Sequence, residues 1–126
     1  MNADVLCFFN EHAEALPLYE RLESGILARV PGTEIRIAKT QISFFYRRMY
    51  ACASFLPVRR AKDRPHPWLT VTFSLPEKVE DPRIDVATEP YPRRWTHHVM
   101  IGRPEEVDEQ LLAWIAAAAA FAATKR

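Results

Sequence analysis

The sequence of 126 residues has few of the residues from which several common kinds of site are built. Its two cysteines, Cys7 and Cys52, are far apart, so the sequence predicts neither a disulfide framework nor a structural zinc site. It has only three glycines, none in a phosphate-binding loop, and it lacks the GxSxG motif of α/β-hydrolases. These absences argue against P-loop nucleotide hydrolases, Rossmann enzymes and α/β-hydrolases. We expect no cofactor.

Long hydrophobic runs are also missing. The longest, Leu111 to Ala123, has 13 residues, whereas a membrane-spanning helix needs about 20. The N-terminus carries Asp4 and Glu11 and has no basic segment of the kind that begins a signal peptide. We therefore expect a cytoplasmic protein with reduced thiols and no membrane partner.

The remaining composition is that of one ordinary domain over residues 1–126. Hydrophobic residues make up 48% and charged residues 26% of the chain, which is too apolar for intrinsic disorder. A chain of this length buries roughly two-thirds of the surface that it exposes when unfolded, so a hydrophobic core needs no disulfide or metal.

Three segments have helical character. Asn2 is a candidate N-cap for a short first helix, and Asn10 for a second whose apolar residues recur every three or four positions from Leu16 to Val30. Pro104, followed by acidic residues, opens a long C-terminal helix.

Alternation of apolar and polar residues predicts five strands, over residues 34–39, 41–47, 49–56, 69–75 and 95–101. The links between the first three are so short that they allow only antiparallel hairpins. Residues 57–68 read as a mobile basic loop, and residues 76–94 are too rich in proline and acids for regular structure throughout. The fold class is α+β, an antiparallel sheet of about five strands packed against N-terminal helices and a long C-terminal helix.

Charge is segregated along the chain, although the whole sequence has 17 basic and 16 acidic residues. Residues 36–64 contain eight lysines and arginines and a single acid, Asp63. Such a segment could form a localised surface for an anionic partner. The competing interpretation is that these are ordinary outward positions of strands and a turn, balanced by acidic helix faces.

Two stretches resemble a known family. They are Arg36-Ile-Ala-Lys-Thr-Gln-Ile-Ser-Phe44 with Tyr46-Arg-Arg48, and Glu89-Pro-Tyr-Pro92 with Arg94-Trp-Thr-His-His-Val99. The sequence is similar here to the bacterial domain family DUF5655, and the resemblance runs from about Phe8 to the terminal helix. It implies a small α+β domain that occurs alone or joined to other modules, some of them nuclease-like. It implies no reaction and no catalytic residues.

Several side chains are candidates for a site. Lys39 and Gln41 are two apart and share a strand or hairpin face, where they could hold a carboxylate or phosphate, form a hydrogen-bonded surface, or leave Lys39 buried against Glu89. Adjacent His97 and His98 point to opposite faces of a strand and cannot chelate one metal in regular geometry, so we expect no metal site.

Two hypotheses of function follow. The first is a non-catalytic binding module whose basic sheet and loop surface meets nucleic acid or an acidic protein. The second is a small-molecule sensor or enzyme with a pocket around Lys39, Gln41 and His98, lined also by Tyr46 and Trp95. We favour the first hypothesis and do not favour enzymatic activity. A homodimer is a third expectation. The candidate binding residues are Lys39, Gln41, Arg47, Arg48, Arg59, Arg60, Tyr91, Trp95 and His98.

Overall fold

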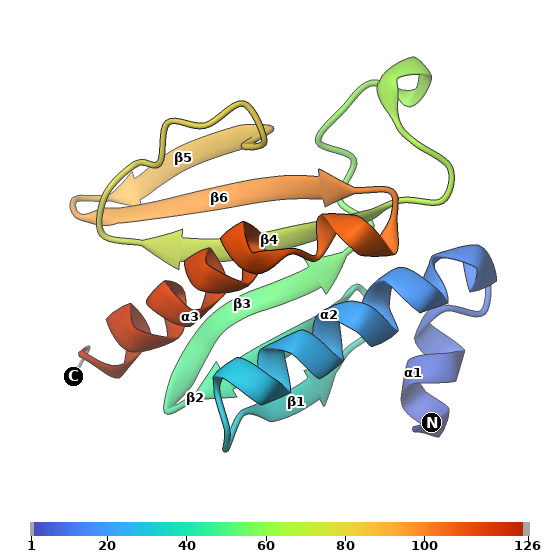
Figure 1. Cartoon of the computed structure of the whole chain (residues 1–126), viewed down its shortest axis with the longest axis horizontal. Coiled ribbons are helices and arrows are strands. Elements are labelled where there is room, and N and C mark those ends of the chain that lie inside the picture. Colours follow the sequence, from blue (N-terminus) through green and yellow to red (C-terminus); the bar gives the residue numbers. More distant parts are fainter. Residues whose placement is uncertain (1, 125–126) are drawn as a thin grey trace.

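One antiparallel sheet with the two long helices on one of its faces forms the body of the molecule (Figure 1). The computed structural model describes residues 2–124. The sheet order is β1-β2-β3-β4-β6-β5, and α2 and α3 lie side by side across it. The elements are α1 Ala3–Phe8, α2 Leu16–Arg29, β1 Glu34–Ile37, β2 Gln41–Tyr46, β3 Arg48–Ser54, β4 Leu69–Leu75, β5 Val86–Tyr91, β6 Arg94–Ile101 and α3 Glu109–Ala123, with 3-10 turns at Ala13–Ala15, Ala61–Asp63 and Pro104–Glu106.

The alternation predicted for the strands separates two faces of the sheet. On β4, Val71 and Phe73 are buried toward the helices, whereas Thr72 and Ser74 point to the other face and are partly exposed. The helices supply a matching apolar stripe from Leu18, Tyr19, Leu22 and Ile26 of α2 and Leu111, Ile115, Ala118, Ala119 and Ala122 of α3. The core is therefore a single layer between helices and sheet.

The two long helices approach each other closely at Gly25. A Cβ atom at this position would lie 2.9 Å from the side chain of Leu112, well inside contact distance. A larger residue at Gly25 would force the Leu112 side chain to shift, so the glycine leaves room for that side chain between the helices.

Local capping determines where the helices begin. The predicted starts of the second helix and of the C-terminal helix were wrong. Asn2 caps α1 as expected, because its side chain accepts a hydrogen bond from the Asp4 amide at 2.7 Å. However, α2 begins at Leu16 after a 3-10 turn, not at Asn10. Likewise α3 begins at Glu109 with Asp108 as its N-cap, and Pro104 opens only a 3-10 turn.

The expectation of about five strands was one strand short. β5 lies within the proline-rich stretch that the sequence analysis left irregular, and it pairs only with β6. The pairing shifts register between Thr88 and Tyr91, around Pro90. The outer side of an edge strand has no neighbouring strand, so a proline that faces outward removes no hydrogen bond from the sheet. The fold class, α+β with one antiparallel sheet, was correctly predicted.

The segment between β3 and β4 is fastened to the sheet. Arg59 pairs with Asp85 at 2.7 Å, and the same carboxylate accepts the Met100 amide at 2.7 Å. The Thr70 hydroxyl donates to the Leu56 carbonyl at 2.7 Å. These contacts join the first part of the loop to β4 and, through Asp85, to β6. No helix within residues 2–124 is long and apolar enough to cross a membrane.

His97 belongs to the core. Its ring stacks on Phe73 with centroids 5.2 Å apart, and Nε2 accepts a hydrogen bond from the Val79 amide at 3.0 Å. Burial lowers the pKa of His97 below its ordinary 6.5, partly opposed by backbone carbonyls of Phe73 and Trp95. His97 is therefore neutral at pH 7 and helps to hold the β4–β5 connection.

This burial predicts a pH-dependent stability. As pH falls through 6.5, the unfolded chain protonates at His97 before the folded protein does, so the stability present at neutral pH is lost. The free energy of unfolding, measured with urea between pH 7 and 5.5, should fall with a slope of at most about 1.4 kcal/mol per pH unit from this group. His97→Gln keeps an acceptor without a titratable ring and should flatten the slope. An unchanged slope would contradict the assignment.

Candidate functional site

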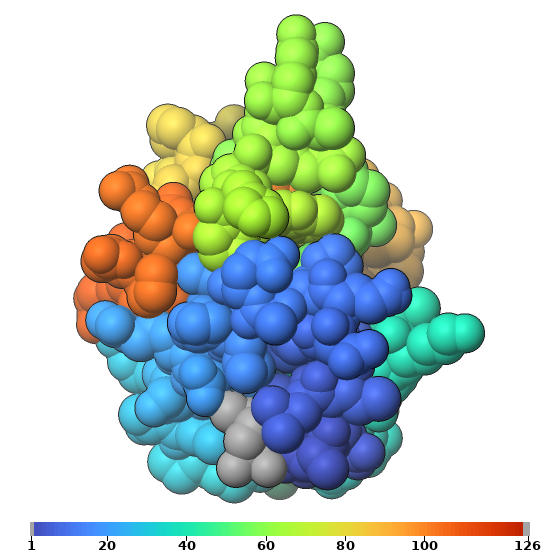
Figure 2. All heavy atoms as spheres, turned by 90° about the vertical axis from the view of Figure 1, so that its right-hand side faces the viewer, coloured from blue at the N-terminus to red at the C-terminus, as the bar shows by residue number. Residues whose placement is uncertain are grey.

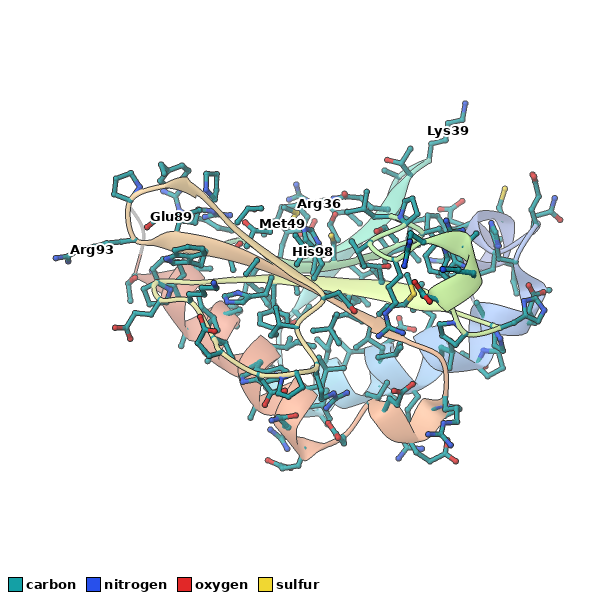
Figure 3. The ribbon with its side chains drawn as sticks, turned by 90° about the horizontal axis from the view of Figure 1, so that it is seen from above. Arg36, Lys39, Met49, Glu89, Arg93 and His98 are labelled. Atoms are coloured by element: carbon teal, nitrogen blue, oxygen red, sulfur yellow. The ribbon has the colours of Figure 1, made fainter. Side chains whose placement is uncertain are left out.

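The face of the sheet opposite the helices carries a line of polar side chains. Strand register places Ser43, Cys52, Thr72 and His98 next to one another across β2, β3, β4 and β6. Figure 3 shows His98 and Met49 on this face, with α2 and α3 on the other side of the sheet. The line arises because the outward positions of four paired strands fall in the same row.

A cleft of about 820 Å³ lies over part of this face. Its floor contains Gln41, Cys52, Thr72 and His98, and its rim includes Lys39. The walls come from the end of α1 with residues 10–12 and from the start of the β3–β4 loop at residues 55–57. In Figure 2 this end of the molecule faces the viewer, with the N-terminal helix below and the projecting loop above. A volume of this size accommodates a small organic molecule.

Hydrogen bonds fix the side chains of the floor. The Thr72 hydroxyl and His98 Nδ1 are 2.8 Å apart, and Gln41 Nε2 donates to the Ser43 hydroxyl at 2.8 Å. Gln41 Nε2 also lies 3.7 Å from the Met49 sulfur. The floor is thus preorganised, and the carbonyl oxygen of Gln41 and Nε2 of His98 have no hydrogen-bond partner among the described residues.

The titratable groups of the floor are uncharged at neutral pH. Burial lowers the pKa of His98 below 6.5, although the carboxylate of Asp85 acts in the opposite direction. Burial also raises the pKa of the Cys52 thiol above 9.0, partly offset by a hydrogen bond with Thr72. The cleft therefore presents a neutral imidazole and a neutral thiol to a ligand.

One wall of the cleft is aromatic. The rings of His12 and Phe55 stack with centroids 4.0 Å apart, and Phe8 stacks on Phe55 at 5.8 Å. The Trp68 ring meets the Phe55 ring edge-on, with ring centroids 5.5 Å apart. This cluster joins α1 to the β3–β4 loop and gives a ligand an apolar surface beside the polar floor.

Three of the predicted site residues come together here. Lys39, Gln41 and His98 all line the cleft, although they belong to the β1–β2 turn, β2 and β6. Lys39 is exposed and extends away from the sheet, and Glu89 lies in the hairpin at the other end (Figure 3). The suggestion of a buried Lys39 paired with Glu89 was therefore wrong.

The other predicted site residues lie elsewhere. Arg47, Arg48 and Tyr91 are exposed at hairpins at the opposite end of the sheet. Arg59 and Arg60 are in ion pairs with Asp85 and Asp63. Trp95 faces the helix side of the sheet, opposite Leu75, and Tyr46 is at the end of β2, so neither lines the cleft. The basic segment does not form one surface, and binding by its members stays a prediction.

Sequence analysis missed the centre of the floor. Cys52 and Thr72 on the floor and the exposed Cys7 at the wall were not among the candidate binding residues. The available signal was the outward row of polar residues, but its members meet only once the strand register is known. Within residues 2–124, no three His, Cys, Asp or Glu side chains are grouped as metal ligands.

Comparison with protein families gives one match. Residues 7–122 match the model of DUF5655, described as a domain of unknown function, and this match covers nearly the whole chain. The chain belongs to the DUF5655 family. No match was found among curated proteins or among solved structures. The description of the family carries no activity and no site residues.

The two cysteines of the cleft should differ in reactivity. Cys7 is exposed, whereas Cys52 is buried with a raised pKa, so iodoacetamide at pH 7.5 should alkylate Cys7 much faster. Mass spectrometry of Cys7→Ser and Cys52→Ser variants would assign the two rates. Equal rates at both thiols would show that Cys52 is not enclosed as described.

Proposed function

We propose that this DUF5655 domain binds a small molecule in the cleft over Cys52, Thr72 and His98. The observation that carries the proposal is the convergence of Lys39 and Gln41 with these three floor residues around about 820 Å³ of space. Concave sites with an apolar wall and a few fixed polar groups are the usual form of ligand sites.

The chemistry of the cleft defines the class of ligand. A neutral imidazole, a thiol, an amide and hydroxyls favour an uncharged head group that both donates and accepts hydrogen bonds. The stacked wall of Phe8, His12 and Phe55 favours a flat ring next to that head group. Lys39 at the rim suits an anionic substituent that stays in solvent. A planar heteroaromatic amide with a peripheral carboxylate combines these features.

Recognition fits the floor better than nucleophilic catalysis does. A catalytic cysteine reacts as its thiolate and has a lowered pKa, whereas burial raises the pKa of Cys52. We therefore propose a sensor or carrier without a covalent step. Both cysteines are free thiols, which suits a reducing compartment such as the cytoplasm.

The proposal is tested by fragment binding observed in amide NMR spectra. Nicotinamide and related heteroaromatic amides would be titrated into the labelled protein. We expect amide shifts concentrated at Cys52, Thr72 and His98. Thr72→Val removes the hydroxyl held at His98 Nδ1 and should weaken binding at least about tenfold.

A matched control comes from the same face of the sheet. Thr96 lies outside the cleft, so Thr96→Val makes the same chemical change without touching the floor and should bind as the wild type does. Shifts scattered away from the cleft, equal losses in both variants, or no binding by any fragment of this class would contradict the proposal.

A further inference from the structure

Two hairpins at the end of the sheet away from α1 and the β3–β4 loop are closed by the same residue types, tyrosine and arginine. In the β2–β3 hairpin, Tyr46 lies opposite Arg48 with Arg47 between them. In the β5–β6 hairpin, Tyr91 lies opposite Arg94 with Pro92 and Arg93 between them. Figure 1 shows both turns at the same end of the sheet. Each turn thus presents a tyrosine and two arginines.

The backbone of both turns is costly for arginine. Arg47 has φ of 69° and Arg93 has φ of 66°, and among residues 2–124 these are the non-glycine residues with positive φ. Glycine and asparagine adopt this conformation with less strain and are the usual residues at such turn positions. Arginine at both turns therefore costs stability that a glycine would recover, which points to a role for the side chains.

The side chains of the two turns are free to meet a partner. Tyr46 and Tyr91 are 41% and 51% exposed. Arg47, Arg48 and Arg93 have no ion pair within the described part of the chain, and Arg94 lies over the Tyr91 ring at 5.7 Å.

An acid is also present in the second hairpin. Glu89 accepts a hydrogen bond from the Arg93 backbone amide at 3.3 Å, which supports the turn. In Figure 3 the Arg93 side chain extends outward from the tip, away from the body of the molecule. The acid therefore holds the backbone that presents the guanidinium.

From the paired Tyr–Arg turns we infer that this end of the sheet binds single-stranded nucleic acid. Guanidinium groups contact phosphates, and exposed tyrosine rings accept unpaired bases by stacking. A surface with cations alone would suit any polyanion, but here each turn also exposes a ring, and unstacked bases are available in single strands. An acidic protein would use the arginines without needing the tyrosines.

Fluorescence anisotropy with a labelled single-stranded oligonucleotide of mixed sequence tests this inference. Arg47→Gly/Arg93→Gly removes two cations and relieves both turns. It should raise the melting temperature, weaken binding at least about tenfold, and make the log–log salt slope shallower by about 1.4. Tyr46→Leu/Tyr91→Leu should weaken binding by about tenfold or more through lost stacking.

The control Arg21→Gln/Lys62→Gln removes two exposed charges elsewhere and should change affinity far less. Thr72→Val should bind the oligonucleotide as the wild type does, which separates this site from the cleft. The inference is overturned if the wild type does not bind at low salt or if the control loses as much affinity as the arginine variant. It is also overturned if the tyrosine variant binds normally and polyglutamate displaces the labelled oligonucleotide as well as unlabelled oligonucleotide does. That result would indicate an acidic protein partner.

Discussion

The constraint on which the structure depends is that α2 and α3 cover only one face of a six-stranded antiparallel sheet. Burial of that face stabilises the fold through an apolar layer that includes Phe44, Val71 and Phe73. Apolar and polar residues must then alternate along the strands, so polar groups such as Thr72 and His98 occupy the outward positions. A row of hydrogen-bonding side chains on the open face is a direct consequence of covering the other one.

Different chemistry occupies the two ends of the molecule. At one end, α1 and the β3–β4 loop rise beside the open face and enclose the cleft, held by the contacts that Asp85 makes with Arg59 and the Met100 amide. At the other end, arginines and tyrosines are exposed at the hairpin turns. The cleft offers neutral hydrogen-bonding groups, whereas the turns offer charge and flat rings, so a small ligand and an extended anion could bind at once.

Sequence alone predicted the features that depend on local patterns. Alternation located β4, and the apolar spacing from Leu16 to Val30 located α2. It missed β5, because Pro90 and neighbouring acids hide an edge strand that is held by a single partner. It also grouped Arg47 with Arg59 by position in the chain, although Arg59 is ion-paired with Asp85 and Arg47 lies in the turn between β2 and β3. Cys52 and Thr72 became neighbours of His98 only through register, which no single segment encodes.

The central claim is that the floor of the cleft is uncharged and enclosed at neutral pH. Titration of the His98 ring by NMR tests it most directly, because the imidazole lies on the floor and is hydrogen-bonded to Thr72. The predicted result is a midpoint below 6.5, with a neutral ring at pH 7. A midpoint at or above 6.5 would mean that burial does not lower the pKa of His98, and it would contradict the account.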